Sequence, residues 1–147
     1  MKDQNKKNQK QQVYNPFLPL NEYIPDGEPH VFGDRVYHFG SHDKEGGYTF
    51  CMLDYVAYSA PVTDLSDWRY EGVIYQAKQD PRYPDPQYMY APDVVQGNDG
   101  RYYLYYCMGG DYGQGGYQGP ISVAVCDEPA GHYEYLGIVK NPDGSPM

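Results

Sequence analysis

The sequence predicts an all-β protein built from two four-stranded units. Three observations predict the class: helical periodicity is almost absent, short alternating or β-branched and aromatic runs recur, and Gly, Pro, Asn and Asp separate these runs. The separating residues are the ones that tight turns require. The runs are RVYHFG (35–40), YVAYSA (55–60), EGVIYQ (71–76), RYYLYY (101–106), ISVAVC (121–126) and YLGIVK (135–140).

The two halves of the chain resemble each other. EPHVFGDRVYHFGS (28–41) matches APDVVQGNDGRYYLYYCM (91–108), because in both a Pro-x-Val leads through a Gly/Asp turn to Arg-x-Tyr. VAYSAPVTDLSDWRYEGVIY (56–75) matches VAVCDEPAGHYEYLGIVK (123–140) in the same way. Matching positions lie 63 to 66 residues apart, as for Pro29 and Pro92 (63), Arg35 and Arg101 (66), and Gly72 and Gly137 (65).

A repeated unit of this length, with about four strands, is typical of one blade of a β-propeller. We expect blades at about 29–76 and 91–140, inner strands near 35–40 and 101–106, and a connection over 77–90. A propeller closes with at least about four blades. The chain is therefore expected to join the missing blades or to self-associate.

Charge and composition argue against several classes of partner. Twenty acidic and 11 basic residues give a net charge of −9, which repels nucleic acid and anionic membranes. The chain shows neither an apolar leader nor a stretch long enough to cross a membrane, so we expect a cytoplasmic protein, with a disordered polar tail over 1–12. Three cysteines without CxxC spacing predict neither a disulfide framework nor a structural zinc site, and we expect no metal.

Two carboxylates stand near the expected inner strands. Asp26 precedes the first and Asp93 precedes or opens the second, so adjacent blades would direct both groups at one funnel. Converging carboxyl groups are what hydrolysis of a glycosidic bond requires. The 19 tyrosines suit a polar, sugar-binding cleft as well as packing. A purely structural role stays open at this point, because Asp before Gly and Asp after Pro are ordinary turn formers.

Three stretches resemble the opening blades of glycoside hydrolase family 43. They are NPFLPLNEYIPDGEPHVFGDRVYHFGSHD (15–43), LDYVAYSAPVTDLSDWRYEGVIY (53–75) and YAPDVVQGNDGRYYLYYCM (90–108). The resemblance runs from about Asn15 to the end of the chain and implies a five-bladed propeller. It also implies an inverting glycosidase that needs no cofactor, because the family consists mostly of β-xylosidases, α-L-arabinofuranosidases and arabinanases.

The resemblance assigns the general base to an Asp in the first inner turn. Anchoring on HVF (30–32) and SHD (41–43) places Asp26 at that position. Anchoring on Pro29 selects Glu28 as the alternative base. No residue of the chain matches the family's general acid, so we expect that group to come from a later blade.

Other site residues are also implied. Asp93 matches the carboxylate that orients and tunes the general acid, and Tyr90 stands where the family often has Trp, as a predicted substrate contact. His42, Asp43 and Asp54 are expected near the channel mouth. We predict that they contact the sugar, with hydrogen bonding or packing within the fold as the alternative.

The leading interpretation is the first two blades of a glycosidase acting on xylose- or arabinofuranose-containing oligosaccharides. One alternative is a non-catalytic carbohydrate-binding or assembly fragment of a propeller. Another is a related furanosidase that works by retention, with the Asp as nucleophile. The separation of the two carboxyl groups distinguishes the enzymes, at about 6.5–9.5 Å for inversion and about 5–5.5 Å for retention.

Overall fold

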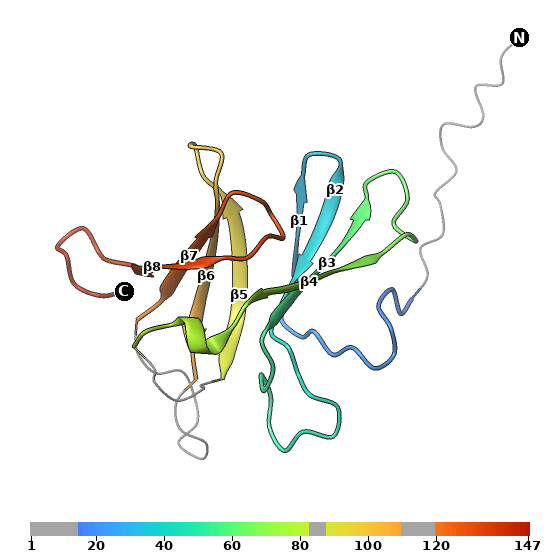
Figure 1. The fold of residues 1–147 in the computed structure, drawn as a ribbon, viewed down its shortest axis with the longest axis horizontal. Coiled ribbons are helices and arrows are strands. Elements are labelled where there is room, and N and C mark those ends of the chain that lie inside the picture. Colours follow the sequence, from blue (N-terminus) through green and yellow to red (C-terminus); the bar gives the residue numbers. More distant parts are fainter. Residues whose placement is uncertain (1–14, 83–87, 110–119) are drawn as a thin grey trace, which may run out of the picture.

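Two four-stranded antiparallel sheets make up the structure, a computed structural model that describes residues 15–82, 88–109 and 120–147. The strands of each sheet follow one another in chain order, and the sheets lie side by side (Figure 1). The predicted all-β class and the two four-stranded units are confirmed, while the predicted tail over 1–12 lies outside the described residues. The strands are β1 (Glu28–Phe32), β2 (Arg35–Phe39), β3 (Tyr55–Pro61), β4 (Arg69–Tyr75), β5 (Met89–Gln96), β6 (Tyr102–Met108), β7 (Ser122–Cys126) and β8 (Glu134–Ile138).

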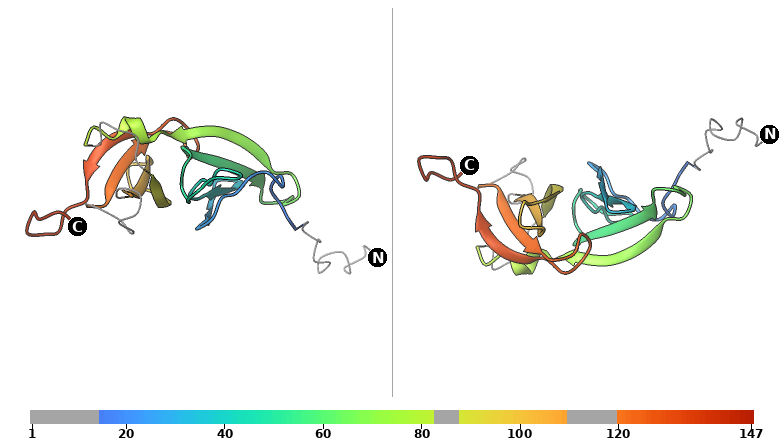
Figure 2. Two further views of the ribbon diagram at one scale, coloured as in Figure 1. Left: turned by 90° about the horizontal axis from the view of Figure 1, so that it is seen from below. Right: turned by 90° about the horizontal axis from the view of Figure 1, so that it is seen from above.

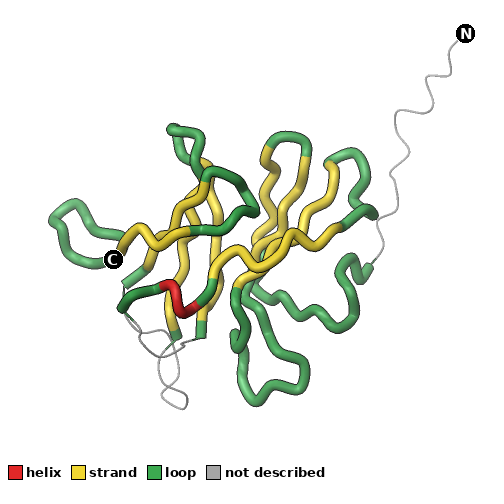
Figure 3. The backbone as a smooth tube through the Cα atoms, viewed as in Figure 1, coloured by secondary structure: helices red, strands yellow, loops and turns green. Residues whose placement is uncertain are grey.

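The connection between the sheets contains one 3₁₀ turn, η2 (Ala77–Gln79), the only helical element among the described residues (Figure 3). Asp54 binds the start of this turn: its Oδ1 accepts the backbone N–H of Ala77 at 3.0 Å, and its Oδ2 accepts the side-chain amide of Gln76 at 2.9 Å. Within the described part of the chain, no helix is long and apolar enough to span a membrane.

The first hairpin of the chain fixes which segments share an end of the sheet. Gly33, with φ 63°, begins the two-residue turn between β1 and β2. The register pairs Glu28 with Phe39, so the start of β1 and the end of β2 lie together. The turn that contains Asp26 therefore stands beside the loop that follows β2.

β1 and β5 are the innermost strands. Each is the first in its sheet, and Oδ1 of Asp93 in β5 lies 2.6 Å from Nε2 of His30 in β1. The prediction of inner strands near 35–40 and 101–106 is wrong, because those segments form β2 and β6, the second strands. β2 and β6 pair on both sides and end in buried residues, so they carry the stronger strand pattern, whereas three of the five β1 residues are exposed.

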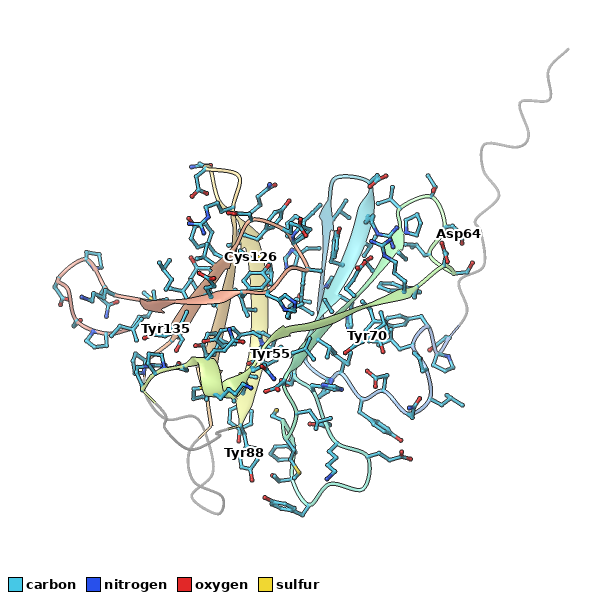
Figure 4. The ribbon with its side chains drawn as sticks, in the orientation of Figure 1. Tyr55, Asp64, Tyr70, Tyr88, Cys126 and Tyr135 are labelled. Atoms are coloured by element: carbon cyan, nitrogen blue, oxygen red, sulfur yellow. The ribbon has the colours of Figure 1, made fainter. Side chains whose placement is uncertain are left out.

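The core lies between the sheets and relies on tyrosine. Tyr55, Tyr75 and Tyr106 are at most 2% exposed. Figure 2 shows the two sheets side by side and inclined to each other, and Tyr55 stands at their junction (Figure 4). The hydroxyls of Tyr75 and Tyr106 lie 2.8 Å apart, and Tyr55 donates to the carbonyl of Tyr90 at 2.9 Å. Tyrosine thus buries its ring and still pairs its hydroxyl, which suits an interface between blades.

Asp80 anchors the connection to the second sheet. The residue is 1% exposed, and Oδ2 accepts hydrogen bonds from Tyr106 Oη at 2.8 Å and from Arg82 Nη2 at 2.7 Å. Burial opposes ionisation of this carboxyl, but the hydrogen bonds from Arg82 and Tyr106 outweigh burial and lower the pKa of Asp80. The connection is therefore held by a buried, ionised carboxylate.

Candidate functional site

Asp26 lies in an exposed turn directly before β1. Its φ of 56° is in the left-handed region, which Asp tolerates better than most side chains. A Cβ on Gly27 would stand 2.0 Å from Cε1 of His38, and a Cβ on Gly40 would stand 2.7 Å from the carbonyl oxygen of Pro25. The two glycines therefore allow the turn to lie directly on the end of β2.

Ser41 follows β2 and links Asp26 to the second sheet. The residue is fully buried. Its Oγ donates to Oδ2 of Asp26 at 3.2 Å and accepts the backbone N–H of Ala91 in β5 at 2.8 Å. A hydroxyl makes both bonds at once because it carries one proton and two lone pairs. The carboxylate in the first sheet is thus held by a residue that also contacts the second.

A β-bulge in β5 shapes the other side of the site. The pairing with β6 shifts between Tyr90 and Asp93, and Ala91 within the bulge has φ 33°. The side chain of Asp93 is 54% exposed and contacts His30 across the sheets. Asp93 contacts His30, the third residue of β1, whereas Asp26 precedes β1. The two carboxylates therefore occupy different levels along the inner strands.

The expectation that Asp93 precedes or opens its inner strand at a position like that of Asp26 is wrong. β5 begins at Met89, so Asp93 lies inside the strand, while Asp26 precedes β1. The repeat itself shows the reason: Pro29 matches Pro92, so the counterpart of Asp93 is His30. Its tuning role toward a general acid stays a prediction.

The three predicted sugar contacts near the mouth have partners within the fold. His42 donates from Nδ1 to the carbonyl of Asp54 at 2.8 Å, in the tautomer that protonates Nδ1, and its Nε2 lies 3.6 Å from Oε2 of Glu22. Oδ1 of Asp43 accepts the N–H of Cys51 at 2.5 Å. Both carboxylate oxygens of Asp54 are used by the η2 segment. Substrate contact by these residues stays a prediction. Asp54 is the least available for it, because both of its carboxylate oxygens already accept hydrogen bonds within the fold.

Tyr90 and Cys51 line the buried side of the site. A Cβ on Gly109 would stand 2.5 Å from the Tyr90 ring, so the ring lies against that glycine. Burial raises the pKa of Tyr90 and raises that of Cys51 to about 11. At neutral pH Cys51 is therefore a thiol and not a nucleophilic thiolate.

A pocket of about 480 Å³ opens beside Asp43. Three aromatic side chains in it are exposed: Tyr23 by 42%, and Tyr48 and Phe50 by 64% each. Aromatic faces beside polar groups suit a sugar ring, which has an apolar face and a rim of hydroxyls. The remaining lining residues are Lys44, Glu45, Gly46, Gly47 and Thr49.

Three other carboxylates considered as catalytic groups are also exposed. Glu28, the alternative base, is the first residue of β1 and is exposed. Glu128 and Glu134 are exposed as well, and Glu134 belongs to β8, the outermost strand of its sheet. Among the residues that the structure describes, no three or more His, Cys, Asp or Glu side chains are grouped to hold a metal ion.

Sequence reasoning did not assign Ser41 or the aromatic loop around Tyr48 to the site. The available signals were the pair of small residues Gly40-Ser41 at the end of a strand, and GGYTF (46–50) between two strands. Small residues after a strand indicate close approach of another backbone, but they do not say which one.

The sequence model of Glycosyl hydrolases family 43 matches residues 21–146, which is most of the chain. The chain belongs to this family. The family 43 assignment covers the turn of Asp26, Ser41 and the bulge of β5, so all the elements described above lie within the matched region.

Curated relatives carry xylosidase/arabinosidase names. One from Thermoclostridium stercorarium is 55% identical over 138 residues, covering 92% of this chain and 28% of the relative. Xylosidase/arabinosidase 43A from Humicola insolens is 30% identical over 141 residues, covering 88% of this chain and 38% of the relative. The chain thus spans about a third of the length of these relatives.

Solved structures of family 43 enzymes share the arrangement of the sheets. RS223-β-xylosidase superposes with a TM-score of 0.65 at 25% identity, covering 84% of this chain and 42% of the other. A GH43_1 enzyme from Xanthomonas citri complexed with xylotriose gives 0.63 at 30% identity, covering 78% and 32%. An exo-β-1,3-galactanase from Clostridium thermocellum, at 21% identity and a TM-score of 0.61, shows the fold alone. The predicted five-bladed propeller class is confirmed, with two blades in this chain.

Proposed function

We propose that these two blades supply the general-base side of the active site of a glycosidase that hydrolyses xylose- or arabinofuranose-containing oligosaccharides with inversion. The observation that carries the proposal is the exposed carboxylate of Asp26, held by buried Ser41 at the start of an innermost strand. The xylosidase/arabinosidase relatives and the xylotriose complex of a related enzyme support the substrate class.

The chemistry follows from this placement. Ser41 engages Oδ2 of Asp26, so we assign Oδ1 to the attacking water. Asp26 takes a proton from that water as it attacks the anomeric carbon, and an acid on the opposite face protonates the leaving oxygen. In an inverting enzyme the two carboxyl groups stand about 6.5–9.5 Å apart, which leaves room for the water.

The general acid and the remaining wall of the funnel are assigned to further blades, either in a longer chain or in an assembly. Apolar side chains on both sheets support this, since Tyr70, Val95 and Leu136 are 54%, 47% and 55% exposed. A blade that packs beside each sheet would cover such side chains.

The test uses the complete ring that carries this sequence, assayed on an aryl β-xyloside and an aryl α-L-arabinofuranoside. Asp26→Asn should lower kcat by about 10²–10⁴-fold with KM nearly unchanged, because only the proton-accepting group is lost. Glu28→Gln is the matched control and should be milder. A larger loss from Glu28→Gln would assign the base to Glu28.

The stereochemistry is tested separately. NMR of the first product formed should show the anomeric configuration opposite to that of the substrate. Retained configuration would contradict inversion and make the Asp a nucleophile.

The second candidate function is carbohydrate binding without catalysis, and the aromatic pocket beside Asp43 favours it. Titration of the complete ring with xylotriose, followed by tyrosine fluorescence, should then show binding without release of reducing sugar. Turnover that depends on Asp26 would exclude this candidate.

A further inference from the structure

We propose that Ser41 is a positioning residue for the general base, and that it makes the orientation of Asp26 depend on the contact between the two blades. The inference rests on the proposed function of Asp26. It extends that function because it states how the second blade, which does not contain the base, controls it.

The direction of the hydroxyl proton is set by the geometry. The N–H of Ala91 can only donate, and it points at Oγ of Ser41 from 2.8 Å. Ser41 has one proton and two possible acceptors for it, the Cys51 thiol and Oδ2 of Asp26 at 3.2 Å, and a carboxylate is a much stronger acceptor than a thiol sulfur. The proton must therefore point at the carboxylate. The backbone N–H of Ala91 in β5 thus determines that Ser41 donates its proton to Asp26.

Burial makes this arrangement more than an ordinary surface contact. Ser41 is fully buried, so water does not compete for its hydroxyl, whereas Asp26 is exposed and would otherwise be oriented only by solvent. An exposed carboxylate gains little stability from one donor, but it gains a fixed direction. A base must stand within hydrogen-bond reach of its water, so direction is what catalysis needs.

The backbone on both sides of Ser41 supports the same conclusion. Asp26 has φ 56° and Ala91 has φ 33°, and residues other than glycine rarely have a positive φ. Such conformations are strained and persist where the surrounding structure requires them. Two of them converge on one hydroxyl, which joins the turn of the first blade to the bulge of the second.

The test compares Ser41→Ala, Ser41→Thr and Ser59→Ala in the complete ring. Ser41→Ala removes the donor and should lower kcat by about ten- to 100-fold with KM changed by less than about twofold, because misplacing a catalytic group by about 1 Å has effects of this size. Ser41→Thr keeps the hydroxyl and should restore most of the loss. It also decides the matter if Ser41→Ala fails to fold.

Ser59→Ala is the matched control. Ser59 is equally buried and also bonds charged side chains, accepting from Nε of Arg35 at 2.8 Å and donating to Glu71, but it does not contact Asp26. This variant should lower the melting temperature and leave kcat within about twofold of the native value, since a purely structural loss does not act on the transition state.

The outcomes separate the two proposals. Native kcat in Ser41→Ala, or a loss in Ser41→Thr as large as in Ser41→Ala, would overturn the positioning role while Asp26→Asn remains inactive. Turnover that survives Asp26→Asn would overturn the proposed function itself, whatever Ser41 does.

Discussion

Gly27→Ala should disable the site by moving the turn that carries Asp26. The added Cβ would stand 2.0 Å from Cε1 and 2.5 Å from Nε2 of His38. Ordinary van der Waals contact begins at 3.4 Å, so the turn or the ring must move by the difference of about 1.4 Å. His38 cannot swing away freely, because it is 8% exposed and packs edge-on against Phe17 at 5.5 Å and against Trp68 at 6.4 Å.

The expected displacement of the turn sets the size of the effect. Misplacing a catalytic group by about 1 Å lowers rates by up to about 10²-fold, so kcat in the complete ring should fall by about ten- to 100-fold. Steady-state kinetics on an aryl β-xyloside measures this, with the melting temperature recorded alongside. Gly137→Ala is the control, because a Cβ at Gly137 meets nothing within 4 Å.

A second comparison identifies the cause. In a His38→Ala background the ring is gone, so adding Gly27→Ala should have little further effect on kcat. Native kcat for Gly27→Ala with His38 in place would refute the reasoning, because it would mean that Asp26 tolerates a displaced turn. An equal loss in both backgrounds would refute it as well, because the ring would not be the cause.

Three further predictions concern titratable groups. Asp93→Asn should lower the melting temperature modestly, because it weakens the contact with His30. A role in tuning the general acid would also shift the alkaline limb of the kcat/KM pH profile. A loss of stability without that shift would mean that Asp93 serves only the contact with His30. Burial lowers the pKa of His38 below its ordinary value of 6.5, so the unfolded chain binds the proton first, and the free energy of unfolding should fall as pH decreases through 6.5. Denaturant titrations of native protein and His38→Gln should differ in this pH range, and parallel curves would contradict the assignment. Asp80→Asn should destabilise the protein by about 3–5 kcal/mol because it removes the buried carboxylate that accepts from Arg82, Tyr106 and Ser122, and a change in urea midpoint equivalent to less than about 1 kcal/mol would contradict that role.

The fold was more predictable from the sequence than the site. Turn residues and alternation locate the strands, and the spacing of Pro29 and Pro92 locates the two sheets, because both signals are local or repeated. The sequence points to the wrong order of strands within a blade because β1 has no buried residue against three in β2, and β5 has four exposed residues against one in β6. A strong strand pattern in the sequence therefore indicates a buried strand, and it does not indicate how close that strand lies to the propeller axis.

The site required contacts between segments far apart in the chain. Asp26 was predicted from its turn, but Ser41 contacts Asp26 across 15 residues and Ala91 across 50. Neither contact follows from local propensity, since a buried serine at a strand end has many possible partners. The packing of Gly27 against His38 was equally hidden, because the sequence shows the glycine and not what fills the space that its missing side chain leaves.

Gly40 and Gly109 occupy the same place in the two blades, directly after β2 and directly after β6. An added Cβ at Gly40 would strike Pro25 in the segment before β1, and one at Gly109 would strike the ring of Tyr90 near the start of β5. In both blades, the space that a side chain would take at this position is filled by a segment near the first strand of the same blade, and the filling residues differ. In the first blade this space holds the segment that leads into the acidic turn of Asp26, and in the second it holds the aromatic ring of Tyr90. Two blades with the same strand order therefore carry different side chains at this end, a carboxylate turn in one and a tyrosine ring in the other.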